Sequence, residues 1–88
     1  MNETYYKSED WLNEFESPST GSIVCYDGWR DYSDGPDRCT FIEVADCHQK
    51  IRLHKAQGDT IEDFIAKATK MRNALTYFIN HLKKHKEI

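Results

Sequence analysis

The sequence has five side chains with the sulfur and nitrogen atoms that usually bind zinc: Cys25, Cys39, Cys47, His48 and His54. Zinc sites commonly take ligands in closely spaced pairs, because one tight turn then presents both. No Cys-x-x-Cys pair occurs here, and gaps of 13 and 7 residues separate the three cysteines. Buried cysteine otherwise behaves as a small apolar residue. We therefore expect cysteines that pack in the core, with no metal ion and no cofactor.

Cys47 and His48 have the groups of a thiol nucleophile and its general base. Adjacent side chains of an extended chain point to opposite sides, whereas this chemistry needs them within hydrogen-bond distance. The sequence has no Gly-x-Ser-x-Gly, phosphate-loop or His-Glu-x-x-His motif. We therefore expect a protein that is not an enzyme and has no catalytic residues.

Residues 26–37 are the most unusual segment, because twelve residues contain four aspartates and three aromatic residues: Tyr26, Asp27, Trp29, Asp31, Tyr32, Asp34 and Asp37. Calcium loops place oxygen ligands at alternate positions and end with a glutamate, a spacing that these aspartates lack. Exposed tryptophan and tyrosine often anchor protein interfaces, and carboxylates around them complement a basic partner. One interpretation is therefore a partner-binding surface at a hairpin tip. The other is a tryptophan packed in the core beside a solvated turn.

Charge is distributed unevenly along the chain. Residues 1–48 contain eleven acidic and three basic residues, a net charge of −8, whereas residues 49–88 have a net charge of +5. A basic face on the third strand and the last helix is therefore an alternative site, for RNA or DNA. Its candidate residues are Lys50, Arg52, Lys55, Lys67 and Lys70. The acidic half disfavours this alternative, because it would repel a polyanion.

The last third of the chain predicts one long amphipathic helix over residues 59–86. Apolar residues from Ile61 to Leu82 recur at steps of three and four, and Asp59 with Glu62 has the spacing of a capping box. Such a helix is about 40 Å long, whereas strands of seven or eight residues reach only about 25 Å. We therefore expect an overhang or a break near Arg72-Asn73. An overhang needs cover, either from the aromatic residues near the N-terminus or from a second copy in a homodimer.

The rest of the chain predicts a short helix over residues 8–16 and a three-stranded sheet over residues 22–56. Its strands are expected at residues 22–26, 39–44 and 49–55, where β-branched or alternating apolar residues occur. The predicted fold is a single α+β domain over residues 1–88, with the order α-β-β-β-α. In it, the long helix packs on one face of a three-stranded antiparallel meander.

The same order of elements is similar to that of double-stranded-RNA-binding domains. Those domains have a basic cluster at the start of the last helix, where this chain has Asp59, Glu62 and Asp63. In size, acidity and element order the chain resembles small inhibitors from phages and mobile elements, such as anti-CRISPR and anti-restriction proteins. That resemblance implies a non-enzymatic module that docks on a basic protein surface of a nucleic-acid-handling protein or complex.

The location of the protein is also predicted from composition. No apolar run exceeds four residues, so we expect no membrane span. The first residues lack the basic start and apolar stretch of a secretion signal. An odd number of cysteines favours a reducing compartment, and we expect a cytoplasmic protein.

Overall fold

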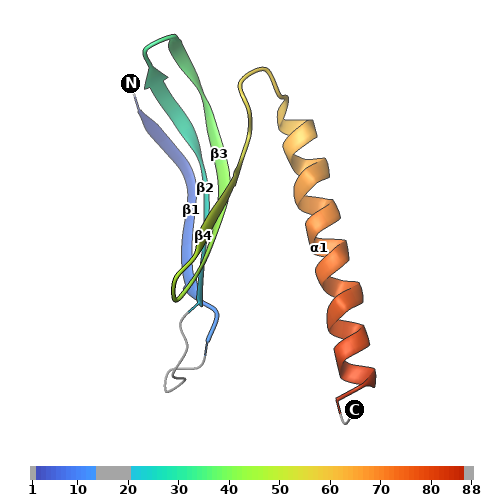
Figure 1. The fold of residues 1–88 in the computed structure, drawn as a ribbon. Coiled ribbons are helices and arrows are strands. Elements are labelled where there is room, and N and C mark those ends of the chain that lie inside the picture. Colours follow the sequence, from blue (N-terminus) through green and yellow to red (C-terminus); the bar gives the residue numbers. More distant parts are fainter. Residues whose placement is uncertain (1, 14–20, 87–88) are drawn as a thin grey trace. The chain divides into compact units, whose positions relative to one another are not determined.

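The structure, a computed structural model, describes residues 2–13 and 21–86 (Figure 1). The chain divides after Gly58 into a sheet unit, residues 1–58, and a helix unit, residues 59–88. Gly58 has a φ of +94°, a conformation that residues with a side chain rarely adopt. The predicted α+β class is confirmed, because an antiparallel sheet precedes one C-terminal helix.

The sheet has four strands where the sequence predicted three. They are β1 (Glu3–Trp11), β2 (Gly21–Tyr32), β3 (Gly35–Asp46) and β4 (Lys50–His54). The strands lie in the order β1-β2-β3-β4, and each pairs antiparallel with the next. The predicted meander is therefore confirmed, with one more strand.

The additional strand replaces part of the helix predicted over residues 8–16. Residues 8–11 belong to β1, and residues 14–16 of that prediction lie outside the described residues. A nine-residue helix is marginal without tertiary support. The backbone of β1 instead finds its hydrogen-bond partners on β2, from Glu3 opposite Trp29 to Trp11 opposite Ser22. A register shift between Thr4 and Tyr6 marks a β-bulge in this pairing.

The hairpin between β2 and β3 is longer than predicted. The sequence interpretation ended the first strand at Tyr26 and began the next at Cys39, whereas β2 and β3 pair without interruption to Tyr32 and Gly35. A two-residue turn, Ser33-Asp34, joins them. Gly35 follows it with a φ of +116°, a value that glycine adopts without steric cost.

The two faces of the sheet differ in character, since successive side chains of a strand point to opposite sides. Near the β3–β4 turn, the register places six apolar residues on one side, which we call the apolar face: Ile23, Cys25, Ile42, Val44, Ile51 and Leu53. Toward the β2–β3 turn, the same side has Asp27, Trp29, Arg38 and Thr40. The opposite side, the polar face, has charged and aromatic residues: Lys7, Glu9, Tyr26, Arg30, Phe41, Glu43, Arg52 and His54. Tyr26 is the large side chain of the sheet unit that is buried among the described residues, at 6% exposure.

The helix unit contains α1 (Ile61–Lys84), which is continuous through Arg72 and Asn73, so the predicted break is absent. Thr60 is the N-cap, because its hydroxyl accepts a hydrogen bond from the Asp63 N–H, and the Asp63 carboxylate accepts one from the Thr60 N–H. This capping box is one residue beyond the predicted pair of Asp59 and Glu62. Packing of α1 on the sheet stays a prediction.

The elements of the structure also bear on two expectations from the sequence, the similarity to double-stranded-RNA-binding domains and the absence of a membrane span. The observed order, β-β-β-β-α, differs from that of double-stranded-RNA-binding domains, so that similarity is not retained. In the described part of the chain, no helix has the length and apolar character needed to cross a membrane.

Candidate functional site

The β2–β3 hairpin extends beyond both of its neighbouring strands. β1 ends its pairing with β2 at Trp29, and β4 ends its pairing with β3 at Phe41. One further backbone hydrogen bond, from Lys55 N–H to the Thr40 carbonyl, is 2.8 Å long. Residues 30–37, which we call the hairpin arm, therefore form a two-stranded projection that contains most of the acidic, aromatic segment.

Aromatic stacking holds the base of the hairpin arm on the polar face. The rings of Tyr26 and Phe41 lie opposite each other, with centroids 5.3 Å apart and planes at 19°. The guanidinium of Arg30 lies 4.9 Å from the Tyr26 centroid, and that of Arg52 lies 4.0 Å from the Phe41 centroid. Both cations thus lie over the electron-rich ring faces. Tyr26, predicted to contact a partner, is buried in this stack at 6% exposure, so its ring presents little surface to a partner.

Asp27 points to the other side of the sheet and is bound within the protein. Its carboxylate accepts hydrogen bonds from Arg38 Nε at 2.9 Å, from Arg38 Nη2 at 2.6 Å and from the Thr40 hydroxyl at 2.9 Å. Bidentate Arg38, followed by Thr40, holds the pKa of Asp27 below its usual value, and Asp27 in turn raises the pKa of Arg38. Asp27 is therefore a structural residue that joins β2 to β3.

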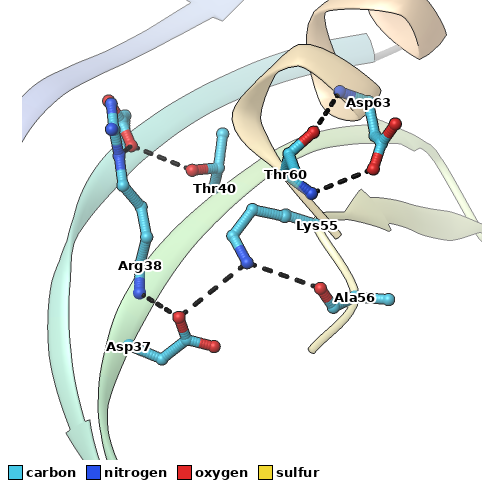
Figure 2. Close-up of polar contacts among 8 residues, drawn as sticks. Asp37, Arg38, Thr40, Lys55, Ala56, Thr60 and Asp63 are labelled. Atoms are coloured by element: carbon cyan, nitrogen blue, oxygen red, sulfur yellow. Dashed lines mark hydrogen bonds and ion pairs between the residues drawn. The ribbon is translucent and has the colours of Figure 1, made fainter. Parts of the chain in front are cut away.

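Asp37 is half-buried and contacts its own neighbours (Figure 2). Its Oδ1 accepts a 2.7 Å hydrogen bond from the Arg38 backbone N–H and lies 3.9 Å from Lys55 Nζ. The Lys55 side chain is only 5% exposed. Both charges are therefore partly used inside the sheet unit, which reduces what Asp37 and Lys55 offer to a partner.

The rest of the predicted site is exposed. Trp29 is 36% exposed and Tyr32 is 49% exposed, and Asp31 and Asp34 lie at the surface. The backbone N–H of Asp31 donates a 2.9 Å hydrogen bond to the Asn2 side chain, which ties the hairpin arm to the start of β1. Since the side chains alternate, Trp29 and Asp31 lie on one side of the hairpin and Tyr32 on the other.

The surroundings of the Tyr32 hydroxyl, in the hairpin arm, shift its pKa. The Cys39 side chain raises the pKa of Tyr32 above its usual value, and the negative charge of Asp37 adds to the shift. Both effects disfavour the charged phenolate, so the hydroxyl is held in its neutral form to higher pH than in an isolated tyrosine.

A pocket of about 620 Å³ opens beside the hairpin arm within the sheet unit. Residues 32–41 line one side, and the remaining lining residues come from the end of β4 and the chain after it: Arg52, His54, Lys55, Gln57 and Gly58. Its wall contains Tyr32 and Phe41 together with charges of both signs. The pocket therefore adds a concave, mixed surface to the projecting arm.

The residues of the alternative nucleic-acid face are divided between the two units of the chain. Lys50 and Arg52 both approach Glu43, with Lys50 Nζ at 3.7 Å from Oε1 and Arg52 Nη2 at 2.7 Å from Oε2. Arg52, and then Lys50, lower the pKa of the Glu43 carboxyl. Lys55 lies beyond the end of β4, and Lys67 and Lys70 belong to the helix unit. A carboxylate between two of the five cations weakens their attraction for phosphate.

The cysteines that were considered as metal ligands are thiols at separate places. Cys25 lies on the apolar face, Cys39 lies on the polar face opposite Gly28, and Cys47 is exposed after β3. Residues 2–13 and 21–86 hold no group of three or more histidine, cysteine or carboxylate side chains close enough to bind a metal ion.

Sequence reasoning missed the residues that position the arm, namely Arg38, Thr40 and Phe41. A signal was present, because a two-residue turn at Ser33-Asp34 places Thr40 opposite Asp27 and Phe41 opposite Tyr26.

Comparison of the chain with known protein families, with curated proteins and with solved structures finds no match.

Proposed function

We propose that this protein is a non-enzymatic protein-binding module that uses its hairpin arm to dock on a basic surface of another protein. The observation that supports this most is the exposure of Tyr32, Asp31 and Asp34 on the projecting arm and of Trp29 at its base. Tryptophan and tyrosine supply large contact areas with few rotatable bonds, so they are frequent interface anchors. Carboxylates around such anchors accelerate encounter with a positive surface and select it over negative ones.

The arm also has the rigidity that a binding element needs. Asp27 joins β2 to Arg38 and Thr40 on β3, and the stacked rings of Tyr26 and Phe41 join the same strands on the opposite face. An element already held in one conformation loses little conformational entropy when it binds. The internal contacts of Tyr26 and Asp27 thus support binding indirectly.

Net charge supports a basic partner. The sheet unit contains eleven acidic and six basic residues, a net charge of −5. A field of this sign steers the arm toward positive surfaces. Proteins that handle nucleic acids have such surfaces, and an arm that occupies one of them would exclude the nucleic acid. We therefore include inhibition of a nucleic-acid-handling protein in the proposal.

The test is affinity capture from nuclease-treated lysate of the cells in which the protein occurs, with bound proteins identified by mass spectrometry. Wild type is compared with an arm variant, Asp31→Lys/Asp34→Lys. The matched control is Glu9→Lys/Asp10→Lys, which makes the same change in net charge at exposed positions of β1 away from the arm. We expect a stoichiometric protein that the wild type and the control retain and that the arm variant loses.

Trp29→Ala is the second variant, because it removes an anchor without changing charge. It should weaken binding of the same protein roughly 30-fold, as expected of an interface hot spot. Equal retention by the arm variant and the wild type would overturn the proposal. Recovery of nucleic acid in place of protein, with loss on Lys50→Glu/Arg52→Glu, would assign the function to the alternative basic residues.

A further inference from the structure

Helix α1 has an apolar stripe with a strict seven-residue repeat. Counting from Ile61 in steps of seven gives one set of core positions, Ile61, Ala68, Leu75 and Leu82. Counting from Phe64 gives the second set, Phe64, Met71, Phe78 and His85. All but His85 are apolar. Such a repeat, continuous over three heptads, is typical of helices that pack along another helix. Phe64 is already buried in the single chain at 6% exposure, whereas the side chains of Leu75, Phe78 and Leu82 are 53%, 57% and 48% exposed.

The apolar face of the sheet is too short to cover this stripe. Its two apolar rows, Ile23-Val44-Ile51 and Cys25-Ile42-Leu53, are only about 7 Å apart along the strands. The next positions on the same side are the polar residues Asp27, Thr40 and Arg38. The stripe from Ile61 to Leu82 is about 32 Å long, or roughly six helical turns. Most of the stripe therefore needs a partner of its own length.

We propose that this partner is α1 of a second copy of the chain, packed antiparallel to form a homodimer. In an antiparallel pair centred on Asn73, the core positions meet as Phe64 with Leu82, Ala68 with Phe78 and Met71 with Leu75. The smallest core residue, Ala68, thus faces a phenylalanine, which fills that layer evenly. A parallel pair would instead place Phe78 against Phe78 and Ala68 against Ala68.

Charge favours the same orientation. The first turn of α1 contains Glu62 and Asp63, and its last turn contains His81, Lys83 and Lys84. Antiparallel packing brings the acidic end of one helix beside the basic end of the other and also opposes the two helix dipoles. Arg72 is the exception, because it lies near the centre of the pair and would approach its own copy. Its removal therefore supplies a test in which the dimer becomes stronger.

The first measurement is sedimentation equilibrium of the full chain from micromolar to millimolar concentration. We expect a monomer–dimer equilibrium for the wild type. Leu75→Glu places a charge in the core and should weaken the dimer at least about 100-fold. Tyr77→Glu makes the same charge change on the same helix at a side chain that is 75% exposed and outside the repeat, so its dimer should match the wild type. Arg72→Leu should tighten the dimer, a result that misfolding cannot mimic.

The orientation is tested by zero-length carbodiimide cross-linking followed by peptide mass spectrometry. In one helix, the first-turn carboxylates of Glu62 and Asp63 are about 30 Å or more from Lys83 and Lys84, so a cross-link between these two end groups must join two copies. We expect this cross-link in the wild type and its loss in Leu75→Glu. A monomer at all concentrations, a dimer that survives Leu75→Glu, or a dimer without this cross-link would overturn the proposal. None of these outcomes changes the test of the hairpin arm, because that test uses residues of the sheet unit.

Discussion

Gly28 is the position at which a single added methyl group should damage the sheet unit most. The Tyr26 side chain lies across Gly28, and its hydroxyl is 3.2 Å from the Thr4 hydroxyl on β1. A Cβ at Gly28 would overlap the Tyr26 hydroxyl and lie 2.5 Å from the Glu3 backbone oxygen. The tyrosine can rotate away only by leaving its stack on Phe41, and the Glu3 oxygen can move only if β1 shifts along β2.

The size of the effect follows from two opposing contributions. Forcing an extra carbon into a packed site typically costs about 1–3 kcal/mol. Replacing glycine with alanine also restricts the unfolded chain, which favours folding by about 0.4–1 kcal/mol. We place the loss for Gly28→Ala near the upper end of this range, about 2 kcal/mol, because one of the two close contacts is with backbone. For a domain of this size, that corresponds to a fall in Tm of about 8–16 °C.

Urea denaturation followed by tryptophan fluorescence measures the free energy of unfolding of the sheet unit, because Trp11 and Trp29 both lie in it. The control is Gly21→Ala in the same strand, where the one close contact of the new Cβ would be with the movable end of Asn13, at 2.9 Å. Leu12 Cβ at 3.5 Å and the Ala45 oxygen at 3.7 Å are at ordinary van der Waals distance. We expect the control to stay within about 0.5 kcal/mol of the wild type. Equal stability of Gly28→Ala and Gly21→Ala would refute the reasoning.

Two further predictions concern stability. Asp27→Asn should lower the free energy of unfolding by about 1–2 kcal/mol at neutral pH, since a partly exposed bidentate pair with Arg38 is lost. Because folding lowers the pKa of Asp27, its contribution is fully present above the unfolded pKa of about 4 and is lost as pH falls through the folded value. Urea titrations at several pH values should therefore show the free energies of unfolding of the wild type and of Asp27→Asn converging below a pH of about 4. A difference between the two free energies that stays constant with pH would contradict this role of Asp27. Thr60→Ala should destabilise α1 by about 1 kcal/mol, seen as lower helicity by circular dichroism, whereas Thr76→Ala, which removes only a bond to the Arg72 carbonyl, should not lower it.

The helix was predictable because its signals are local. The stripe from Ile61 to Leu82 has the helical period, and no glycine or proline interrupts it. Even so, the N-cap moved from Asp59 to Thr60, since several residues in a row have side chains able to cap. The prediction of a break near Arg72 rested on strands of seven or eight residues. The central strands β2 and β3 have 12 residues each, about 40 Å, so the sheet contains strands as long as α1.

The first strand was not predictable from its own residues. Ser8, Glu9 and Asp10 before Trp11 are equally typical of a helix start, and only pairing with β2 decides between the two structures. That pairing crosses residues 14–20, which are rich in serine and contain a proline, and a local pattern says nothing about which distant strand is available. Tertiary context therefore overrode a weak local preference.

The candidate site was predicted as a segment, but a strand divides a segment between two faces. Tyr26 and Asp27 are adjacent in sequence, yet one is buried against Phe41 and the other binds Arg38 on the opposite side. The cross-strand register decides which aspartates form ion pairs within the protein. It puts Arg38 within reach of Asp27 and Lys55 within reach of Asp37. The composition of residues 26–37 was enough to identify the segment. The cross-strand register is what separates its structural residues from its exposed ones.

Charge connects the two proposals. The helix unit contains four acidic and six basic residues, and three of the bases, Lys83, Lys84 and Lys86, lie at or just after the end of α1. In the antiparallel pair these bases lie beside the acidic first turn of the other copy, so their positive charge is compensated locally and contributes little to the distant field. The acidic sheet units, each with a net charge of −5, then dominate what an approaching partner meets. Self-association through α1 would thus leave the acidic hairpin arm as the main electrostatic feature of the protein, which is the condition under which a basic partner is selected.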